Sequence, residues 1–328
     1  MSLIAIRGGL SDPVTPERLA RLSELLPERQ PVVIRDDNEL QRRAEEVGVC
    51  FGKVPPEFVA AASNLRWLQW DAAGVNQIVP AVREVVAGGR QVALTNASGI
   101  HAIPLTEHLL ALMLAFARRL DYSFRLQAEG GWKGSDFPAV FELSGKQVVL
   151  LGVGAIGSAF APKAAALGMQ VVGVRRDATK HHAFLGETVS VERLHEVLPS
   201  ADFVVVTLPY TTETAGIIGA PELALMRNSA YLINIGRGGI VDEAALLDAL
   251  EAGPEGGGIA GAGLDVFETE PLPPEAPIRR APNLIITPHY AGWTPHYSGR
   301  LWELFLANVE AYAAGAPLRN VVDLEVGY

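Results

Sequence analysis

The chain has 328 residues, more than one domain usually holds, so we expect two domains, each with its own core. Its 37 acidic residues outnumber its 27 basic ones, and the formal net charge of −10 argues against nucleic acid or an anionic membrane as a partner. The only cysteine, Cys50, excludes an internal disulfide framework and a multi-cysteine zinc site, and we expect it to be buried. The apolar runs near residues 3–6 and 109–117 are too short for a signal-peptide core or a membrane span, which predicts a cytoplasmic protein.

The first third of the chain alternates short apolar runs with polar segments of helical character. The runs "LIAI" (3–6), "PVVIR" (31–35) and "LRWLQW" (65–70) predict strands of a parallel sheet with helices outside it. The segment 101–120 has the length and composition of a largely buried helix, and we expect it to join the two domains.

A second series of strands begins at residue 146. Six runs rich in β-branched residues are typical of strands covered on both faces, and they predict a doubly wound sheet. These runs are 146–152, 169–175, 201–209, 229–236, 261–267 and 283–289. Loops rich in glycine (253–263) and proline (271–277) interrupt this domain, and a final helix over 301–315 is expected to pack back onto the first domain.

The stretch "LLGVGAIGSAF" (150–160) contains the spacing G-x-G-x-x-G between a predicted strand and a predicted helix. In that order, the glycines let backbone amides approach a pyrophosphate at the amino end of the helix, so the stretch predicts a dinucleotide site. Pro162 fits poorly inside the helix but lies beyond its first turn, so we expect the phosphate-facing amides to survive.

The end of the next strand bears on the choice of cofactor. Arg175 and Arg176 follow the run "MQVVGV" and suit the 2′-phosphate of NADP better than the ribose hydroxyl of NAD. Asp177 lies 20 residues past Gly157 and is the residue expected to bind that hydroxyl if the strand runs longer. We therefore predict NADP, with NAD left open.

Polar residues follow three of the late strands. Arg237, a group of acids at 265–270, and His289 each come directly after an apolar run, where ligands bind in open α/β sheets. Arginine can hold a carboxylate and polarise the adjacent carbonyl, and histidine can protonate the carbonyl oxygen as hydride arrives. A carboxylate hydrogen-bonded to the imidazole favours its protonated form. These residue types suit hydride transfer to a 2-oxo acid. A buried core histidine and a metal ligand are the alternatives for His289.

Several ordered segments resemble the D-isomer-specific 2-hydroxyacid dehydrogenases, a family that includes glyoxylate/hydroxypyruvate reductases and phosphoglycerate dehydrogenase. The resemblance extends from about residue 65 to 320. It is carried by "AAGVNQI", "LTEHLLALMLAFAR", "ELSGKQVVLLGVGAIG", "VVTLPYTTETAGIIG", "INIGRGGIVDEAAL", "AGLDVFETEPLP" and "ITPHYAGWT".

The resemblance implies roles for the residues at the strand ends. Arg237 matches the substrate-binding arginine and His289 the acid/base residue. Glu270, just before Pro271, matches the acidic partner of the histidine, and Glu268 is the second choice for that role.

Further roles follow in the same way. Asp265 matches the residue that faces the nicotinamide amide, and Leu208 with Pro209 matches the turn beside the cofactor. Ala73 and Gly74 match the loop whose backbone amides meet the substrate carboxylate.

Together these observations predict a Rossmann-type domain over residues 100–293 and a smaller flavodoxin-like α/β domain over 1–99 and 294–328, which binds substrate. The predicted cofactor-binding residues are Gly152, Gly154, Ala155, Ile156, Gly157, Arg175, Arg176, Leu208, Pro209, Ile235, Gly236, Arg237, Asp265, His289 and Gly292. The predicted substrate-binding residues are Ala73, Gly74, Arg237, His289 and Trp293.

The resemblance implies reversible NAD(P)H-dependent reduction of a small 2-oxo acid to the D-2-hydroxy acid, with glyoxylate or hydroxypyruvate as first choice. Phosphoglycerate dehydrogenase-like activity and a bulkier 2-keto acid are alternatives, and a nucleotide-sensing, corepressor-like protein is an alternative of another class. The resemblance also implies a homodimer. Trp132 lies in a glycine-rich loop that family members use at or near the dimer contact, and a packing role is the alternative for this residue.

Five further histidines receive no catalytic role. His181, His182 and His195 are expected at the surface, and His101 and His296 near the junction of the domains.

Overall fold

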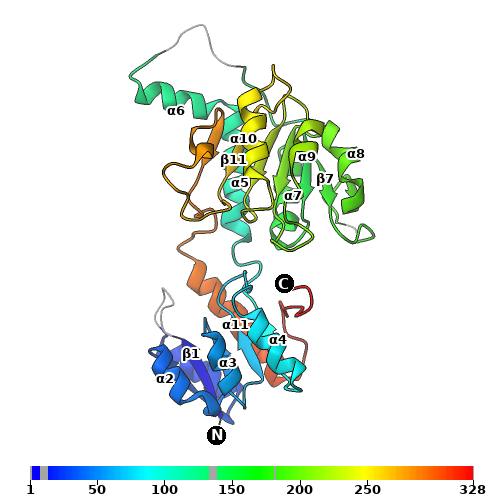
Figure 1. Ribbon diagram of the computed structural model, residues 1–328. Helices are drawn as coiled ribbons and strands as arrows, with labels where there is room; N and C mark the ends of the chain where they lie inside the picture. The colour runs from blue at the N-terminus through cyan, green and yellow to red at the C-terminus, as the bar shows by residue number, and fades with distance from the viewer. Residues whose placement is uncertain (1, 8–13, 133–138, 181, 328) are drawn as a thin grey trace. The chain divides into compact units, whose positions relative to one another are not determined.

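The computed structural model describes residues 2–7, 14–132, 139–180 and 182–327. The chain divides into two compact units (Figure 1). Unit 1 comprises residues 1–100 and 294–328, and unit 2 comprises 101–293. Within the described parts of the chain, no helix is both long enough and apolar enough to cross a membrane.

Unit 1 is built on a parallel sheet. Among its described residues, the sheet has five strands in the order β2-β1-β3-β4-β5, which is the flavodoxin-like arrangement. The strands are β1 (Ser2–Arg7), β2 (Arg29–Ile34), β3 (Val47–Phe51), β4 (Trp67–Gln69) and β5 (Ala93–Thr95).

Helices cover both faces of this sheet and bury its apolar side chains. One core contains residues of α2, α3 and α4, and the other contains residues of α1 and α11. The helices are α1 (Pro16–Leu25), α2 (Asp37–Arg42), α3 (Pro56–Ala61), α4 (Val79–Ala87) and α11 (Tyr297–Ala313). Cys50 lies fully buried in β3, as expected, and burial raises the pKa of its thiol to about 12.

Unit 2 contains a larger parallel sheet. Its described residues form seven strands in the order β12-β11-β10-β9-β6-β7-β8. The order reverses between β6 and β9, so the switch point of a doubly wound sheet lies beside the glycine loop that follows β6. The strands are β6 (Gln147–Leu151), β7 (Gln170–Val174), β8 (Glu187–Val189), β9 (Phe203–Val206), β10 (Tyr231–Asn234), β11 (Gly261–Leu264) and β12 (Leu284–Ile286).

The helices of unit 2 also bury both faces of its sheet. Apolar residues of α5 and α7 form one core, and residues of α8, α9 and α10 form the other. The helices are α5 (Ala102–Ala117), α6 (Leu120–Ala128), α7 (Ala155–Ala166), α8 (Leu194–Val197), α9 (Ala220–Leu225) and α10 (Glu243–Ala252). Two parallel-sheet α/β domains therefore confirm the predicted fold class.

Helix α6 differs from the others because none of its residues is buried. It extends away from the sheet of unit 2 (Figure 1). Phe124 is 65% exposed, and Trp132, just beyond the helix, is 96% exposed. Exposed aromatic side chains of this size are unusual on a surface that contacts only water.

Some element predictions were wrong. The helix expected over 101–120 ends at Ala117, because Arg119 adopts a left-handed backbone (φ 54°) and a new helix begins at Leu120. Strand β8 was missed because its three residues include a charge and no long apolar run. Strands β3 and β5 were also missed. By contrast, helix α7 runs through Pro162, and the helix predicted after the glycine loop is confirmed.

Candidate active site

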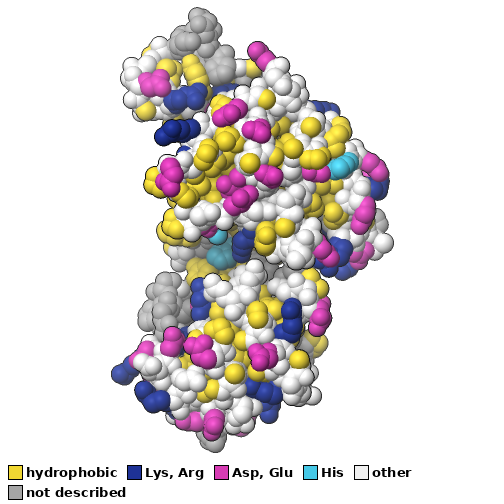
Figure 2. Space-filling view, in the orientation of Figure 1, with side chains coloured by type: hydrophobic (Ala, Val, Ile, Leu, Met, Phe, Trp, Pro, Cys, Tyr) yellow, Lys and Arg dark blue, Asp and Glu magenta, His cyan; other side chains and the backbone are white. Residues whose placement is uncertain are grey.

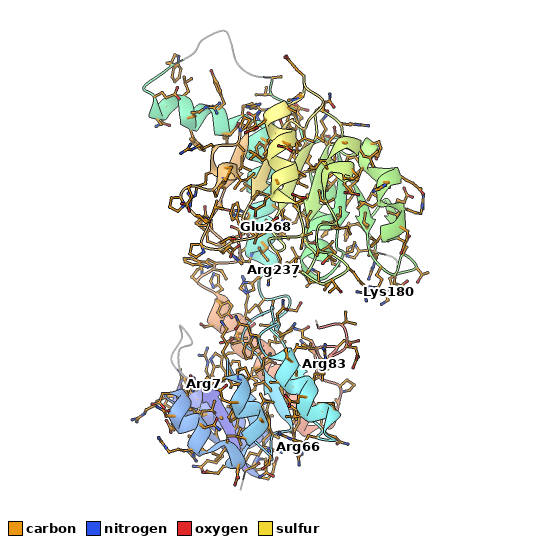
Figure 3. The ribbon with its side chains drawn as sticks, viewed as in Figure 1. Arg7, Arg66, Arg83, Lys180, Arg237 and Glu268 are labelled. Atoms are coloured by element: carbon orange, nitrogen blue, oxygen red, sulfur yellow. The ribbon has the colours of Figure 1, made fainter. Side chains whose placement is uncertain are left out.

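The polar residues expected to carry the chemistry of unit 2 lie where strands end. Arg237 follows β10, Asp265 follows β11, and His289 follows β12. Because the three strands are parallel neighbours, their carboxyl ends share one edge of the sheet. Figure 3 shows Arg237 at this end of unit 2.

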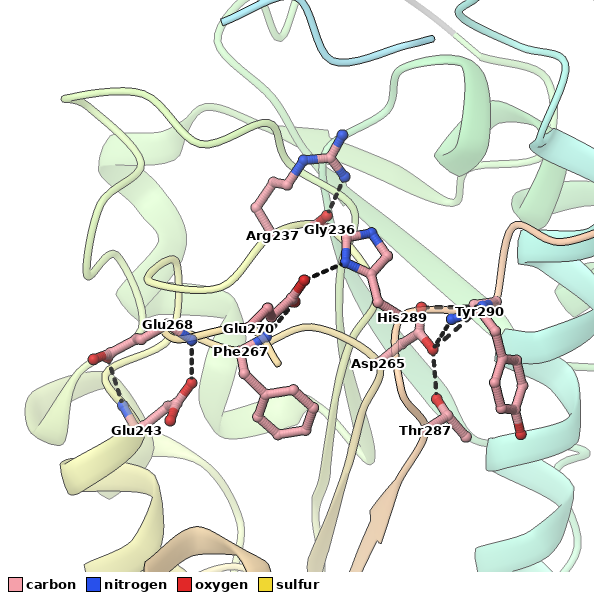
Figure 4. Close-up of polar contacts among 11 residues, drawn as sticks. Gly236, Arg237, Glu243, Asp265, Phe267, Glu268, Glu270, Thr287, His289 and Tyr290 are labelled. Carbon is pink, nitrogen blue, oxygen red and sulfur yellow. Dashed lines mark hydrogen bonds and ion pairs between the residues drawn. The ribbon is translucent and has the colours of Figure 1, made fainter. Parts of the chain in front are cut away.

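Glu270 and His289 form a close polar pair in the site. His289 Nδ1 lies 2.6 Å from Glu270 Oε2, and the carboxylate points at the imidazole ring (Figure 4). The backbone N–H of Phe267 donates to the other oxygen, Glu270 Oε1, at 2.9 Å. Glu270 is thus held in place from its own turn, and Nε2 of His289 is left as the nitrogen able to exchange a proton with a substrate.

Glu268, the second choice for the acid role, faces elsewhere. Its carboxylate accepts the backbone N–H of Glu243, and the Glu243 carboxylate accepts the backbone N–H of Glu268 (Figure 4). Desolvation, together with the charges of Glu268 and Glu270, raises the pKa of Glu243. Glu268 therefore supports the turn instead of contacting the histidine.

Arg237 offers a guanidinium with free donors. Nη1 donates to the carbonyl of Gly236 at 2.7 Å, and the other N–H groups have no acceptor in the described part of the chain. Desolvation by the surrounding loops lowers the Arg237 pKa, and the Glu270 carboxylate opposes that shift. Arginine stays charged under either influence, so the group can bind an anion.

Asp265 is buried behind the histidine, with 1% of its surface exposed. Its carboxylate accepts hydrogen bonds from the Thr287 hydroxyl and from the backbone N–H groups of Tyr290 and Ala291. His289 has φ +51°, a left-handed conformation that costs about 1 kcal/mol for a residue with a side chain. The contacts with Asp265 hold the turn in that conformation, while its predicted role toward the nicotinamide stays a prediction.

The glycine loop after β6 fits a bound dinucleotide. A Cβ on Gly157 would lie 2.1 Å from the carbonyl oxygen of Gly152, whereas a Cβ on Gly154 would meet no atom within 4 Å. Gly152 itself has φ +99°. One glycine therefore permits close helix–strand packing, and another leaves open space before the amino end of α7.

The first turn of α7 provides the expected amides. Gly154 is its N-cap and has no side chain to satisfy them, while Ala155, Ile156 and Gly157 form the first turn. The backbone N–H groups there point out of the helix, and a pyrophosphate is the kind of anion they attract.

The loop after β7 begins with Arg175, since the strand ends at Val174. Arg175 Nη1 donates to the carbonyl of Lys180 at 3.3 Å, and Arg176 forms an exposed ion pair with Glu213 at 3.2 Å. Figure 3 shows Lys180 at the same end of unit 2 as Arg237.

Asp177, the alternative ribose ligand, is engaged within its own turn. Its Oδ1 accepts from the backbone N–H and the hydroxyl of Thr179 at 3.1 and 2.5 Å. These hydrogen bonds are the main cause of the lowered pKa of Asp177. The first residue after β7 is therefore Arg175, whereas Asp177 lies two positions further on and is hydrogen-bonded to Thr179.

The other predicted cofactor residues border the same edge. Leu208 and Pro209 follow β9, and a Cβ on Gly236 would lie 2.6 Å from the carbonyl oxygen of Leu208. Gly236 and the buried Ile235 follow β10. The close approach requires glycine at this position.

Two predicted residues follow the His289 turn. The carbonyl of Gly292 accepts a hydrogen bond from His101 Nδ1 at 2.9 Å. Trp293 is 80% exposed, and its pocket role stays a prediction.

In unit 1, Ala73 and Gly74 follow β4. Their carbonyls accept from Asn96 Nδ2 and Trp70 Nε1, each at 3.0 Å, while their N–H groups have no acceptor among the described residues. The loop is thus anchored through its carbonyls with its amides left to bind an anion.

Of the other histidines, His195 pairs with Glu222 at 2.7 Å on the surface, and His296 is exposed at the start of α11. His182 is partly exposed, and His181 lies outside the described residues. Where the structure describes the chain, no three His, Cys, Asp or Glu side chains gather as metal ligands would.

Comparison with known proteins places this geometry in a family. Residues 110–291 match the family described as D-isomer specific 2-hydroxyacid dehydrogenase, NAD binding domain. The chain belongs to this family. It is 36% identical over 297 residues to glyoxylate/hydroxypyruvate reductase B of Pectobacterium carotovorum, covering 88% of this chain and 89% of that one.

The chain is also similar to two further relatives. The chain is 34% identical over 275 residues to D-3-phosphoglycerate dehydrogenase of Archaeoglobus fulgidus, but those residues cover 83% of this chain and only 50% of that enzyme. The chain therefore spans about half the length of this relative. A D-isomer specific 2-hydroxyacid dehydrogenase from Xanthobacter autotrophicus Py2, solved with NADPH and MES, superposes with a TM-score of 0.81 at 30% identity over the full length of both chains.

In this dehydrogenase family member, one feature of unit 1 escaped the sequence analysis. Asp71, two residues before Ala73, has a buried Oδ1 with no partner among the described residues. Desolvation raises its pKa, and the nearby cations Lys53 and Arg7 act in the opposite direction. Its backbone carbonyl accepts a hydrogen bond from the Tyr297 hydroxyl. Burial of this carboxyl depends on folding, so the sequence carried no signal of it.

Proposed function

We propose that this protein reduces a small 2-oxo acid to the D-2-hydroxy acid, with glyoxylate or hydroxypyruvate as the first choice of substrate. The hydrogen bond of 2.6 Å between Glu270 and His289, beside the free guanidinium of Arg237, carries the proposal. The name of the Pectobacterium relative supports the choice of substrate.

Each residue has a distinct task in the proposed reaction. Arg237 binds the substrate carboxylate and polarises the adjacent carbonyl, because its guanidinium presents paired donors. Carboxylate binding by the backbone amides of Ala73 and Gly74 in unit 1 stays a prediction. His289 donates the proton on Nε2 to the carbonyl oxygen, and Glu270 retains the hydrogen on Nδ1 and orients the ring. In the reverse oxidation, Nε2 accepts the proton.

The nicotinamide cofactor, when bound, supplies the hydride that reaches the carbonyl carbon. The open space at Gly154 and the first-turn amides of α7 fit its pyrophosphate. We propose NADPH as the preferred form, because Arg175 is the first residue after β7 and because the Xanthobacter relative was solved with NADPH.

The activity is tested by initial rates of NADPH and NADH oxidation with a panel of 2-oxo acids led by hydroxypyruvate and glyoxylate. Faster NADPH oxidation with either acid supports the proposal. No oxidation with any acid, by protein shown to bind the cofactor, contradicts it and favours a nucleotide-sensing role.

The cofactor preference has its own test. Arg175→Asp places a negative charge beside the 2′-phosphate, and we expect the ratio of kcat/KM for NADPH to that for NADH to fall by roughly ten- to a hundredfold. Arg193→Asp changes the charge of an exposed arginine that pairs with Glu196, and it serves as the matched control. An unchanged ratio in Arg175→Asp contradicts the assignment.

We further propose a homodimer in which α6 covers a second copy of the chain. The support is the exposed apolar surface of Leu120, Phe124 and Trp132. Figure 2 shows hydrophobic side chains at the end of unit 2 that carries α6. Light scattering that detects only monomer contradicts this assembly. A cytoplasmic location remains a prediction.

A further inference from the structure

His108 contacts the chain on both sides of His289. It lies on α5, and its Nε2 is 3.1 Å from Oγ1 of Thr287, two residues before His289. Its ring also meets the ring of Tyr290, the residue after His289, edge to face at a centroid distance of 5.7 Å. One side chain on a buried helix thus contacts both flanks of the acid/base residue.

The direction of the hydrogen bonds follows from the groups present. The Thr287 hydroxyl lies 2.6 Å from Oδ1 of Asp265. A carboxylate has no hydrogen to donate, so the Thr287 hydroxyl donates its hydrogen to Asp265. The hydroxyl oxygen must therefore accept a hydrogen bond from His108. His108 therefore carries hydrogen on Nε2. Desolvation lowers its pKa, while the charge of Asp265 raises it, so the ring is kept as the neutral tautomer that donates from Nε2.

Asp265 extends this chain of hydrogen bonds to the backbone of the turn. Its carboxylate accepts the N–H groups of Tyr290 and Ala291, each at 3.1 Å, and its own carbonyl accepts the N–H of His289 at 2.9 Å. Figure 4 shows the contacts of Asp265 with Thr287 and Tyr290. His289 keeps φ +51° only while these contacts hold the turn.

We propose that His108 is a positioning residue of the reaction: through Thr287 and Asp265 it holds the turn that aims the His289 imidazole. The role assigned to His289 rests on the proposed function, whereas the chain of hydrogen bonds does not. His108 does not touch the substrate or the cofactor in this scheme. Its removal lowers the fraction of molecules in which Nε2 of His289 is correctly placed, so it acts on kcat more than on cofactor binding.

Two pairs of variants test the inference. His108→Leu and Thr287→Val remove the hydrogen bond with side chains of similar size, whereas His108→Gln and Thr287→Ser keep a donor and a hydroxyl. We expect His108→Leu and Thr287→Val each to lower kcat about tenfold, with the KM for the nicotinamide cofactor and the thermal midpoint of unfolding little changed. Gln and Ser should retain most of the wild-type kcat. His195→Leu, which removes a surface histidine, is the control.

A second measurement follows the turn itself. Amide hydrogen exchange of a peptide that covers residues 287–293 should accelerate in His108→Leu and Thr287→Val but not in His108→Gln or Thr287→Ser. If amide exchange in the 287–293 peptide and kcat are both unchanged in His108→Leu and Thr287→Val, the inference is overturned. Faster exchange throughout unit 2, with a lowered thermal midpoint, also overturns it, because it shows a general role in stability.

The exchange comparison separates this inference from the proposed function. If the wild-type protein reduces none of the 2-oxo acids, the proposed function fails. Exchange in the 287–293 peptide still decides whether His108 holds the turn.

Discussion

The two candidate regions differ in the groups they present. In unit 2, the carboxyl ends of β10, β11 and β12 carry charged side chains. In unit 1, the loop after β4 carries small residues with free backbone amides. Arg237, Glu270 and His289 each have a fixed partner in unit 2. Ala73 and Gly74 present only N–H groups. Proton transfer requires titratable side chains, and each of these must be held in position by its own hydrogen-bond partner. Carboxylate binding requires only oriented N–H donors.

The comparison predicts the largest loss when the acid/base residue is replaced. His289→Asn keeps a group that can hydrogen-bond to Glu270 but cannot donate a proton, so kcat should fall by about 10³-fold. Steady-state kinetics with saturating cofactor measures the effect, and His195→Asn is the matched control. Retention of more than a tenth of the wild-type kcat contradicts the assignment.

Loss of the acidic partner should have a smaller, pH-dependent effect. A carboxylate stabilises the protonated imidazole that reduction consumes, so Glu270→Gln should lower the reduction rate by roughly tenfold, and most strongly at high pH. The rate should therefore begin to fall at a lower pH than in the wild type. The pH profile of kcat measures this, with Glu268→Gln as the control. An equal loss at every pH contradicts a role in retaining the proton.

Two glycines separate folding from cofactor binding in unit 2. Gly157→Ala forces a Cβ to within 2.1 Å of the Gly152 carbonyl and should lower the free energy of unfolding by about 1–3 kcal/mol. Gly154→Ala meets no protein atom within 4 Å, so its stability should be unchanged, while its Kd for the cofactor rises by about tenfold. Calorimetry and cofactor titration measure the two effects. Equal stability of both variants contradicts the packing role of Gly157.

The smallest effect is expected in unit 1, at Asp71. Folding raises the pKa of this carboxyl, so its charged form is disfavoured in the folded state and the stability of the protein falls as pH rises through that pKa. Asp71→Asn should therefore raise the urea midpoint slightly at pH 7, and the difference should vanish at acid pH, where the carboxyl is protonated in both states.

The control for Asp71 is Asp248→Asn, which changes an exposed acid of α10. We expect kcat/KM to be unchanged in both variants. A fall in kcat/KM confined to Asp71→Asn indicates that this carboxyl takes part in the reaction. The contrast between the candidate regions of unit 1 and unit 2 would then be wrong.

The sequence predicted the features that are local in the chain. The glycine turn, the strand ends that carry Arg237 and His289, and the doubly wound sheet each follow from an apolar run and the residue directly after it. Strand β8 was not predicted because its three residues form no apolar run, and only pairing with β7 makes the segment a strand. Likewise, His108 and Thr287 are separated by 179 positions, and only folding brings them together.

Acidic and basic side chains are interspersed on the face drawn in Figure 2. The net charge of −10 indicates an excess of acids but not how the charges are distributed. Such a pattern depends on which residues reach the surface, which the composition does not reveal.

The division of unit 1 into two segments has a consequence for folding during synthesis. Leu301, Trp302 and Phe305 of α11 are buried in the same core as Phe51 and Trp67. A ribosome delivers these α11 residues only after it has made the whole of unit 2. We expect that unit 2, a continuous segment, folds first, while α1 alone covers that face of the β1–β5 sheet and the part that α11 buries stays exposed. We expect the nascent chain to depend most on chaperones during this interval.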